Sequence, residues 1–141
     1  MLGQKPPIIC LQQIAALYKI GLSMTLESQV TDYSKSNGSI ITSFELLACD
    51  CGCEQFLLFS DDNEGGAYVV CTSCKNEHDI QNSKSYIESE DHNICNCENE
   101  ILNIGIGKSF YPDSTDIKWL YVGASCNECG LAGVYVDWHE R

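Results

Sequence analysis

Apolar residues near the beginning of the chain recur every three or four positions. The pattern runs through Ile8, Leu11, Ile14 and Tyr18. Pro7 suits the first turn of a helix, and Gly21 interrupts the pattern, so the expected helix ends near that glycine. Its apolar face is expected to join the core, because a small sheet needs a covering layer.

The next segment alternates between apolar and polar residues. Met24, Leu26, Ser28 and Val30 occupy one set of positions, and polar residues lie between them. A period of two predicts a strand over residues 24–30. Residues 34–39 are rich in Ser, Asn and Gly, which predicts a turn. Residues 40–48 are then expected to form a strand that leads into the first cysteines.

Two β-hairpins are predicted in the remainder of the chain. Residues 56–60 and 67–71 are β-prone runs on either side of a polar, glycine-bearing turn at 61–66. Residues 101–106 and 119–123 repeat this arrangement across a longer loop that contains Pro112 and Asp113, and residues 134–138 add a closing strand. The expected fold class is therefore α+β, with an N-terminal helix packed on small antiparallel β-sheets.

Cysteines give the chain an internal repeat. Ten of the 141 residues are cysteines, and a CxC pair followed by a CxxC pair occurs twice after position 48. The letters match best when Cys51-Gly52-Cys53-Glu54-Gln55 is aligned with Cys95-Asn96-Cys97-Glu98-Asn99. In this register Cys49 corresponds to Asn93, so Cys49 and Cys10 are expected to be spare thiols.

Paired cysteines with these short spacings are typical of zinc sites. Structural zinc takes four ligands at tetrahedral corners, usually two from each of two tight turns. A disulfide framework is the alternative, but the chain shows no secretory signal and a reducing, cytoplasmic location is expected. Two Zn²⁺ ions are predicted, although iron or copper(I) accepts much of the same thiolate set. The expected ligands are Cys51, Cys53, Cys71 and Cys74 for the first ion and Cys95, Cys97, Cys126 and Cys129 for the second.

Through these turns and hairpins, residues 49–138 resemble the zinc-ribbon and zinc-knuckle class, in which two cysteine turns and a small antiparallel sheet enclose one ion. The resemblance implies two four-cysteine units in tandem. The expected organisation is a cover of helix and strand at residues 1–48, a first zinc-ribbon-like repeat at 49–94 and a second at 95–141. One turn of each repeat departs from the class, because it is CxC where the class has CxxC.

The net charge restricts the possible partners. Twenty Asp and Glu residues against eight Lys and Arg residues give a formal net charge of −12. Such a chain repels a phosphate backbone and anionic lipids, so we expect no binding to nucleic acid or to a membrane. A basic protein partner is expected instead. The residues expected to contact it lie in the two hairpin loops: Asp61, Asp62, Glu64, Asp113 and Asp116.

No catalytic site is predicted from the sequence. Gly105-Ile106-Gly107-Lys108-Ser109 ends like a phosphate-binding loop, but Leu102 stands where the first glycine of that motif is required. None of the three histidines has the spacing of a zinc deaminase. Catalytic zinc also keeps an open position, whereas four cysteines close the coordination shell. His78 is expected to lie on the surface, with replacement of one thiol ligand as the less favoured alternative. The chain is expected not to be an enzyme.

Three functions are consistent with these observations. In size and acidity the chain is similar to bacterial immunity proteins, which implies an inhibitor that covers a basic nuclease toxin. The second repeat, with 28 residues between Cys97 and Cys126, is similar to the zinc centre of a heat-shock chaperone activated by oxidation, which implies a redox-switched protein with chaperone-like activity. The third function is a transcription-associated zinc ribbon that contacts proteins. The first is the favoured hypothesis.

Overall fold

The computed structural model describes the backbone of residues 16–141 and the side chains from residue 26 onward. Within this range the protein has one α-helix and one antiparallel sheet of eight strands, so the prediction of an α+β fold is confirmed. The elements are α1 (Ala16–Asn37), β1 (Ser43–Leu46), β2 (Phe56–Asp61), β3 (Gly66–Cys71), β4 (Glu77–Asp79), the 3₁₀ turns η1 (Ile80–Asn82) and η2 (Lys84–Tyr86), β5 (Asp91–Asn93), β6 (Leu102–Phe110), β7 (Ile117–Cys126) and β8 (Ala132–His139).

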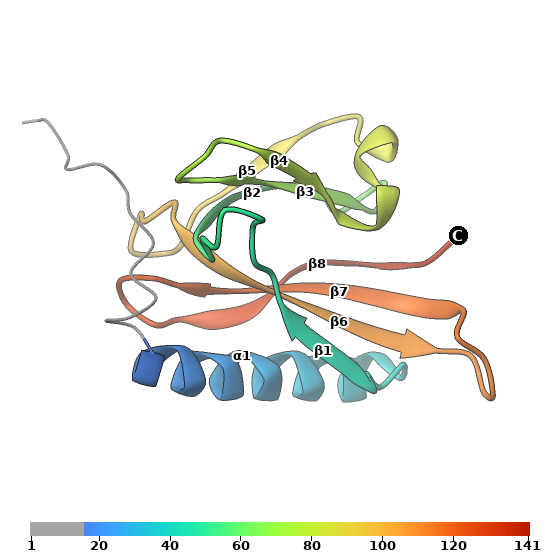
Figure 1. Ribbon diagram of the computed structural model, residues 1–141. Coiled ribbons are helices and arrows are strands. Elements are labelled where there is room, and N and C mark those ends of the chain that lie inside the picture. Colours follow the sequence, from blue (N-terminus) through green and yellow to red (C-terminus); the bar gives the residue numbers. More distant parts are fainter. Residues whose placement is uncertain (1–15) are drawn as a thin grey trace, which may run out of the picture.

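The sheet consists of two halves that meet at a single residue pair. Its strand order is β4-β3-β2-β6-β7-β8, and β2 pairs with β6 only through Phe56 and Leu102. Strand β5 adds to β2, and β1 adds to β6. In Figure 1 the strands β2–β5 form an upper half, and β1, β6, β7 and β8 form a lower half that lies on the helix. The fold thus has three layers: upper half, lower half and helix.

The main core lies between the two halves. Alternate side chains of β7 point into it, because successive residues of a strand face opposite sides of the sheet. Leu120, Val122 and Ala124 join this core, whereas Tyr121 between them packs on the helix side. Buried apolar residues from both halves complete it, among them Phe56, Leu58, Val69, Leu102, Ile104, Ile106 and Val136.

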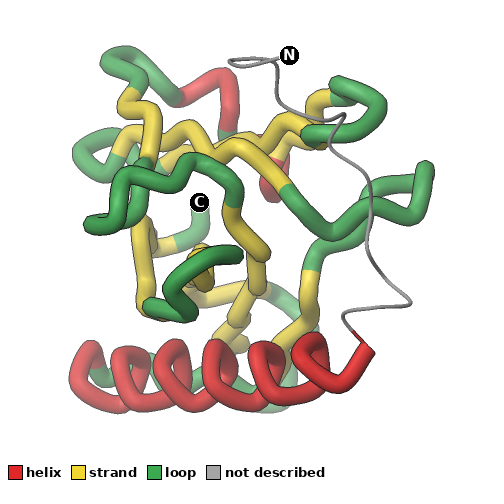
Figure 2. Tube along the Cα trace, turned by 90° about the vertical axis from the view of Figure 1, so that its left-hand side faces the viewer, coloured by secondary structure: helices red, strands yellow, loops and turns green. Residues whose placement is uncertain are grey.

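Helix α1 packs closely on the lower half because that surface carries glycines. Leu26 and Val30 are fully buried and form a second cluster with Ile41 and Tyr121. A Cβ atom at Gly123 would lie 2.6 Å from a methyl carbon of Val30, which is too close for any real contact. Gly105 and Gly107 are similarly crowded by side chains of this cluster. Figure 2 shows the helix along the bottom edge of the molecule, with the strands above it.

The predicted strand over residues 24–30 is wrong, because this segment lies within α1. Leu26 and Val30 are four residues apart, a spacing that also fits one face of a helix, and burial of both against the sheet decides between the two periods. Gly21 does not end the helix. The helix continues to Asn37. Gly38 follows it with a φ of 86°, and the N–H of Gly38 donates a hydrogen bond to Ser34 O at 3.0 Å.

The upper half covers its own outer face with aromatic rings. Phe59 stacks on Tyr68 at 5.1 Å and on His92 at 4.6 Å, measured between ring centroids. The ammonium of Lys84 lies 4.4 Å from the ring centroid of Tyr68. Large rings therefore occupy this face, whereas glycines on the lower half leave room for a helix.

Most predicted strands are confirmed within one to four residues at their ends. The hairpin over 56–71 corresponds to β2 and β3, the second hairpin to β6 and β7, and the closing strand to β8. Only residues 43–46 of the strand expected over 40–48 are in β1. The helix positions expected before residue 16, together with Cys10, lie outside the described residues. Within the described range, no helix combines the length and hydropathy that a membrane span needs.

Adding a methyl group at the interface of helix and sheet should destabilise the protein. We expect Gly123→Ala to lower the free energy of unfolding by about 1–3 kcal/mol, because the new Cβ collides with Val30. Urea denaturation would measure the change. The control is Gly133→Ala, whose Cβ meets no atom within 4 Å. In a double-mutant cycle Val30→Ala should recover part of the loss, and strictly additive effects would contradict this packing.

Candidate metal centres

Each hairpin is preceded by a tight turn that carries a CxC pair. In the first turn the N–H of Gly52 donates to Cys49 O at 2.8 Å, and the N–H of Cys49 donates to Cys53 O at 2.8 Å. Gly52 has a φ of 94°, a left-handed conformation that glycine adopts without steric cost. The turn directs the thiols of Cys49 and Cys51 to one side.

The second CxC turn has the same hydrogen bonds. The N–H of Glu98 donates to Cys95 O at 2.7 Å, and the N–H of Cys95 donates to Asn99 O at 2.9 Å. Glu98 takes the place of Gly52 and also has a positive φ, of 73°. A non-glycine residue is uncommon in this conformation. The two turns are therefore equivalent residue by residue, with Asn99 at the position of Cys53.

Each hairpin is followed by an equivalent CxxC turn. After β3, the N–H of Lys75 donates to Cys71 O at 3.0 Å. After β7, the N–H of Gly130 donates to Cys126 O at 3.1 Å. Lys75 and Gly130 both have positive φ values, 67° and 79°. Because one cysteine turn precedes each hairpin and the other follows it, both turns lie at the base of the hairpin.

These turns bring two groups of four thiols together. The groups are Cys49, Cys51, Cys71 and Cys74, and Cys95, Cys97, Cys126 and Cys129; within each, all sulfur atoms lie within 4.8 Å of one another.

The shortest sulfur-to-sulfur distances are 3.4 Å for Cys49–Cys74 and Cys97–Cys126, 3.5 Å for Cys95–Cys129 and 3.6 Å for Cys51–Cys71. A disulfide bond measures about 2.05 Å, whereas tetrahedral zinc with Zn–S bonds of about 2.3 Å places sulfur atoms about 3.8 Å apart. The distances fit two metal sites of four thiolates.

The predicted ligand set needs one correction, because Cys49 and not Cys53 belongs to the first group. The Cys53 thiol is fully buried and lies 3.8 Å from Gln55 O and 3.8 Å from Thr72 Oγ1. Matching letters had aligned Cys53 with Cys97, but the backbone aligns Cys51 with Cys97. An alignment that pairs the two residues with positive φ, Gly52 and Glu98, places Cys49 opposite Cys95 and so identifies Cys49 as a ligand. The other seven predicted cysteines are in the two groups.

One thiol of each group is prepared for ionisation by hydrogen bonds. Burial opposes the charge on Cys71, but the backbone N–H groups of Cys74 and Ser73 lower its pKa to about 6. The same competition lowers the pKa of Cys126 to about 6, with the N–H of Cys129 as the leading donor. Donors that lie close to a sulfur atom stabilise its thiolate form.

A second thiol in each group resists ionisation. The backbone N–H of Cys51 favours the Cys49 thiolate, but burial and the neighbouring thiols raise the pKa of Cys49 to about 12. The backbone N–H of Asn99 likewise favours the Cys97 thiolate, but the Cys126 thiol and burial raise the pKa of Cys97 to about 12. Thiols held this close lose their protons together only when a cation neutralises the charge.

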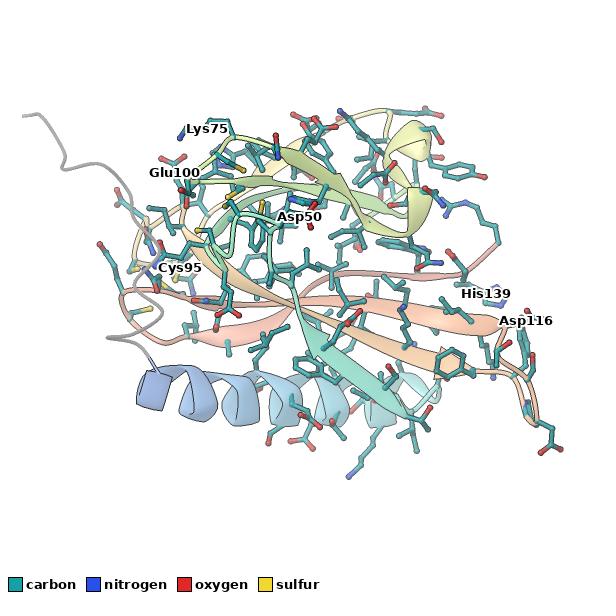
Figure 3. The ribbon with its side chains drawn as sticks, in the orientation of Figure 1. Asp50, Lys75, Cys95, Glu100, Asp116 and His139 are labelled. Atoms are coloured by element: carbon teal, nitrogen blue, oxygen red, sulfur yellow. The ribbon has the colours of Figure 1, made fainter. Side chains whose placement is uncertain are left out.

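The two sites lie at one end of the molecule and the β6–β7 turn at the other. Figure 3 labels Cys95 and Glu100 at the left end and Asp116 and His139 at the right end. Asp62, Glu64, Asp113 and Asp116 are exposed, as expected for contact residues. Gln81, Asp116 and Arg141 are among the residues that line a cleft of about 440 Å³ at this right-hand end.

Asp61 was predicted to contact a partner, but the structure gives it a structural role. The residue is 3% exposed. One carboxylate oxygen accepts the N–H groups of Asn63 and Glu64, and the other accepts those of Glu88 and Ser89 at 2.9 and 3.0 Å. These donors, with Ser89 and Glu88 the strongest, hold the pKa of Asp61 below its usual value. The carboxylate thus joins the β2–β3 turn to the segment after η2.

The glycine-rich stretch that resembles a phosphate-binding loop lies in β6, paired with β7 on one side and with β1 on the other. Its backbone groups form the ladder, and Gly105 and Gly107 face the side chains of helix α1 and β1. The structure therefore explains these glycines by packing.

Comparisons of the chain with models of known protein families, with curated proteins and with solved structures found no match. The geometry of the two cysteine groups and of the acidic loops is therefore the basis for any functional assignment.

Single cysteine substitutions should separate Cys49 from Cys53. We expect Cys49→Ser to reduce the number of bound ions from two to one, because three thiolates and a hydroxyl hold zinc poorly. Cys53→Ser should keep two ions, because its sulfur lies outside the group. Native mass spectrometry of the zinc-loaded proteins would count them. Retention of both ions by Cys49→Ser, with loss of one by Cys53→Ser, would restore the original ligand set.

The Asp61 carboxylate should make stability depend on pH. Because its pKa is lower in the folded state, it stabilises the fold above its unfolded pKa of about 3.9, and this contribution is lost as the pH falls through the folded pKa. Urea unfolding of the wild type and Asp61→Asn should therefore differ most near neutral pH and converge in acid. Loss of metal at low pH affects both proteins, so their difference isolates Asp61. A difference independent of pH would contradict this role.

Proposed function

We propose that the protein is a non-enzymatic, zinc-stabilised binding protein whose acidic hairpin turns contact a basic protein partner. An immunity-type inhibitor that caps a nuclease toxin is the form of this function that the small size and the net charge of −12 favour. The supporting observation is that each four-cysteine group lies at the base of a hairpin, while the exposed acidic residues lie in the turn at its tip.

Zinc suits this role because the sites are closed. Four sulfur atoms complete a tetrahedral shell and leave no position for substrate, which is the arrangement of structural zinc. Cys49, Cys51, Cys71 and Cys74 would hold one ion, and Cys95, Cys97, Cys126 and Cys129 the other. In this proposal the two hairpins are two zinc-ribbon-like units, and α1 (Ala16–Asn37) and β1 (Ser43–Leu46) cover and extend them. The ions supply rigidity, and the chemistry of recognition belongs to the turns.

The acidic turn between β2 and β3 is supported by the C-terminal residue. The guanidinium of Arg141 donates to Glu64 O and Gly65 O, both at 2.6 Å, and lies 3.5 Å from the ring centroid of Tyr86. These contacts attach the end of the described chain to the β2–β3 turn. Asp62 and Glu64 lie exposed in this turn, so a basic surface would meet negative charge on a well-supported loop.

Neutralising the exposed acids of the turns should weaken binding to a cationic probe. We expect Asp62→Asn, Glu64→Gln, Asp113→Asn and Asp116→Asn, combined in one variant, to weaken binding of a poly-lysine peptide about tenfold, which corresponds to about 1.4 kcal/mol. Isothermal titration calorimetry would measure this at low salt, where charge attraction is least screened.

The matched control removes the same amount of charge elsewhere. It combines four substitutions of exposed acids outside the two turns: Glu27→Gln, Asp32→Asn, Glu45→Gln and Glu88→Gln. We expect this control to bind nearly as tightly as the wild type. Equal weakening of both variants would mean that overall charge, and not the turns, attracts the cation.

A further inference from the structure

The two four-cysteine groups have equivalent backbones but different side-chain hydrogen-bond donors. In the first group, Nε2 of His78 lies 3.2 Å from Cys49 Sγ. His78 pairs with Val69 across β3 and β4, and the corresponding pair in the lower half is Ala124 with Gly133. The second group therefore has a glycine where the first has an imidazole, so this donor belongs to one site alone.

Packing holds the His78 ring in place. The ring is half-buried and meets Phe56 edge to face, with centroids 5.9 Å apart and planes at 89°. Its nitrogen contacts Cys49 but does not belong to the set of four ligand atoms that lie within 4.8 Å of one another. His78 is thus positioned to act on the site through a ligand.

The second group has a donor of its own on a different sulfur. The amide nitrogen of Asn99 lies 3.4 Å from Cys126 Sγ. The same amide donates to Ile101 O at 2.8 Å, and its oxygen accepts the N–H of Ile101 at 3.2 Å. The equivalent residue of the first turn is Cys53, which carries no amide. Among the side chains described from residue 26 onward, each site therefore has one donor outside its own cysteines, and the two donors come from non-equivalent positions.

We propose that His78 and Asn99 are outer-shell positioning residues, each of which stabilises the ion of one site only, so that the two metal sites are chemically unequal. This inference rests on the proposed binding of a metal ion to both groups. It assigns to His78 a role different from the surface residue or substitute ligand expected from its sequence position.

The physical reason is the charge on the sulfur atoms. A metal-bound cysteine is a thiolate and can only accept hydrogen bonds, so the imidazole must carry its hydrogen on Nε2. Four thiolates around a divalent ion leave a net charge of −2. A donor beside one sulfur draws charge from it, which disfavours protonation of that sulfur and departure of the ion. Loss of an outer-shell partner typically reduces metal affinity 10- to 100-fold.

The test uses the full chain loaded with Zn²⁺ and follows release to a chromogenic chelator. We expect His78→Leu to release one of its two ions about tenfold faster or more and the other at the wild-type rate. His78→Gln, which retains an amide donor, should recover most of the loss. Asn99→Leu should likewise accelerate one ion. Circular dichroism of each loaded variant would confirm that it remains folded.

Cadmium NMR identifies which site responds. The protein loaded with ¹¹³Cd²⁺ should give two resonances, and His78→Leu should move one of them while Asn99→Leu moves the other. His78→Gln, which keeps a donor, should return the shifted resonance toward its wild-type position, whereas a merely structural loss would not be rescued. If His78→Leu fails to fold, the Asn99→Leu spectrum decides, because the inference requires a single shifted signal there.

Two results would overturn the inference, and they are distinguishable from each other. Release at wild-type rates, or equal acceleration of both ions in either variant, would show that the donors have no site-specific effect. Absence of bound Zn²⁺ or Cd²⁺ in the wild type would instead refute the proposed metal binding, before any variant is compared.

Discussion

Four cysteine thiols converge at the base of each hairpin, and this convergence positions the two halves of the sheet. Each group brings thiols from the segment before a hairpin close to thiols from the segment after it, where an ion would hold the two strands together. Unbound, four thiols this close ionise unequally, with Cys71 and Cys126 favoured and Cys49 and Cys97 opposed. A divalent cation resolves this conflict, because it stabilises all four thiolates at once.

The packing of the chain follows from two hairpins fixed in this way. They meet at the pair of Phe56 and Leu102, which directly follow the two CxC turns, and a shared core fills the space between them. The outer faces then differ according to their side chains. Stacked rings of Phe59, Tyr68 and His92 fill the upper face, and glycines on the lower face admit α1. Two similar units thus form one sheet with unlike surfaces.

The hairpins and most of the cysteine groups were predictable from the sequence because the signals are local. A β-prone run on each side of a polar turn is enough to place β2 with β3, and short cysteine spacings are enough to indicate metal. Strands β4 and β5 could not be found in this way, because Glu77–Asp79 and Asp91–Asn93 are short and polar and owe their conformation to pairing with β3 and β2.

The wrong predictions share a physical cause, because the conformation or role of each residue depends on contacts that its sequence neighbours do not reveal. Leu26 and Val30 fit either a strand or a helix until the glycines of the sheet are known. Asp61 resembles an exposed loop acid until the N–H groups of Glu88 and Ser89 are found beside it. Cys53 matched its counterpart by letter, whereas the ligand position is set by the hydrogen bonds of the turn.

X-ray absorption spectroscopy at the metal edge of the purified full chain, together with metal analysis, would show whether each cysteine group binds an ion. We expect two ions per chain, each surrounded by four sulfur atoms at about 2.3 Å, as is typical of zinc. A chain without metal, or a first shell that includes nitrogen or oxygen, would contradict it.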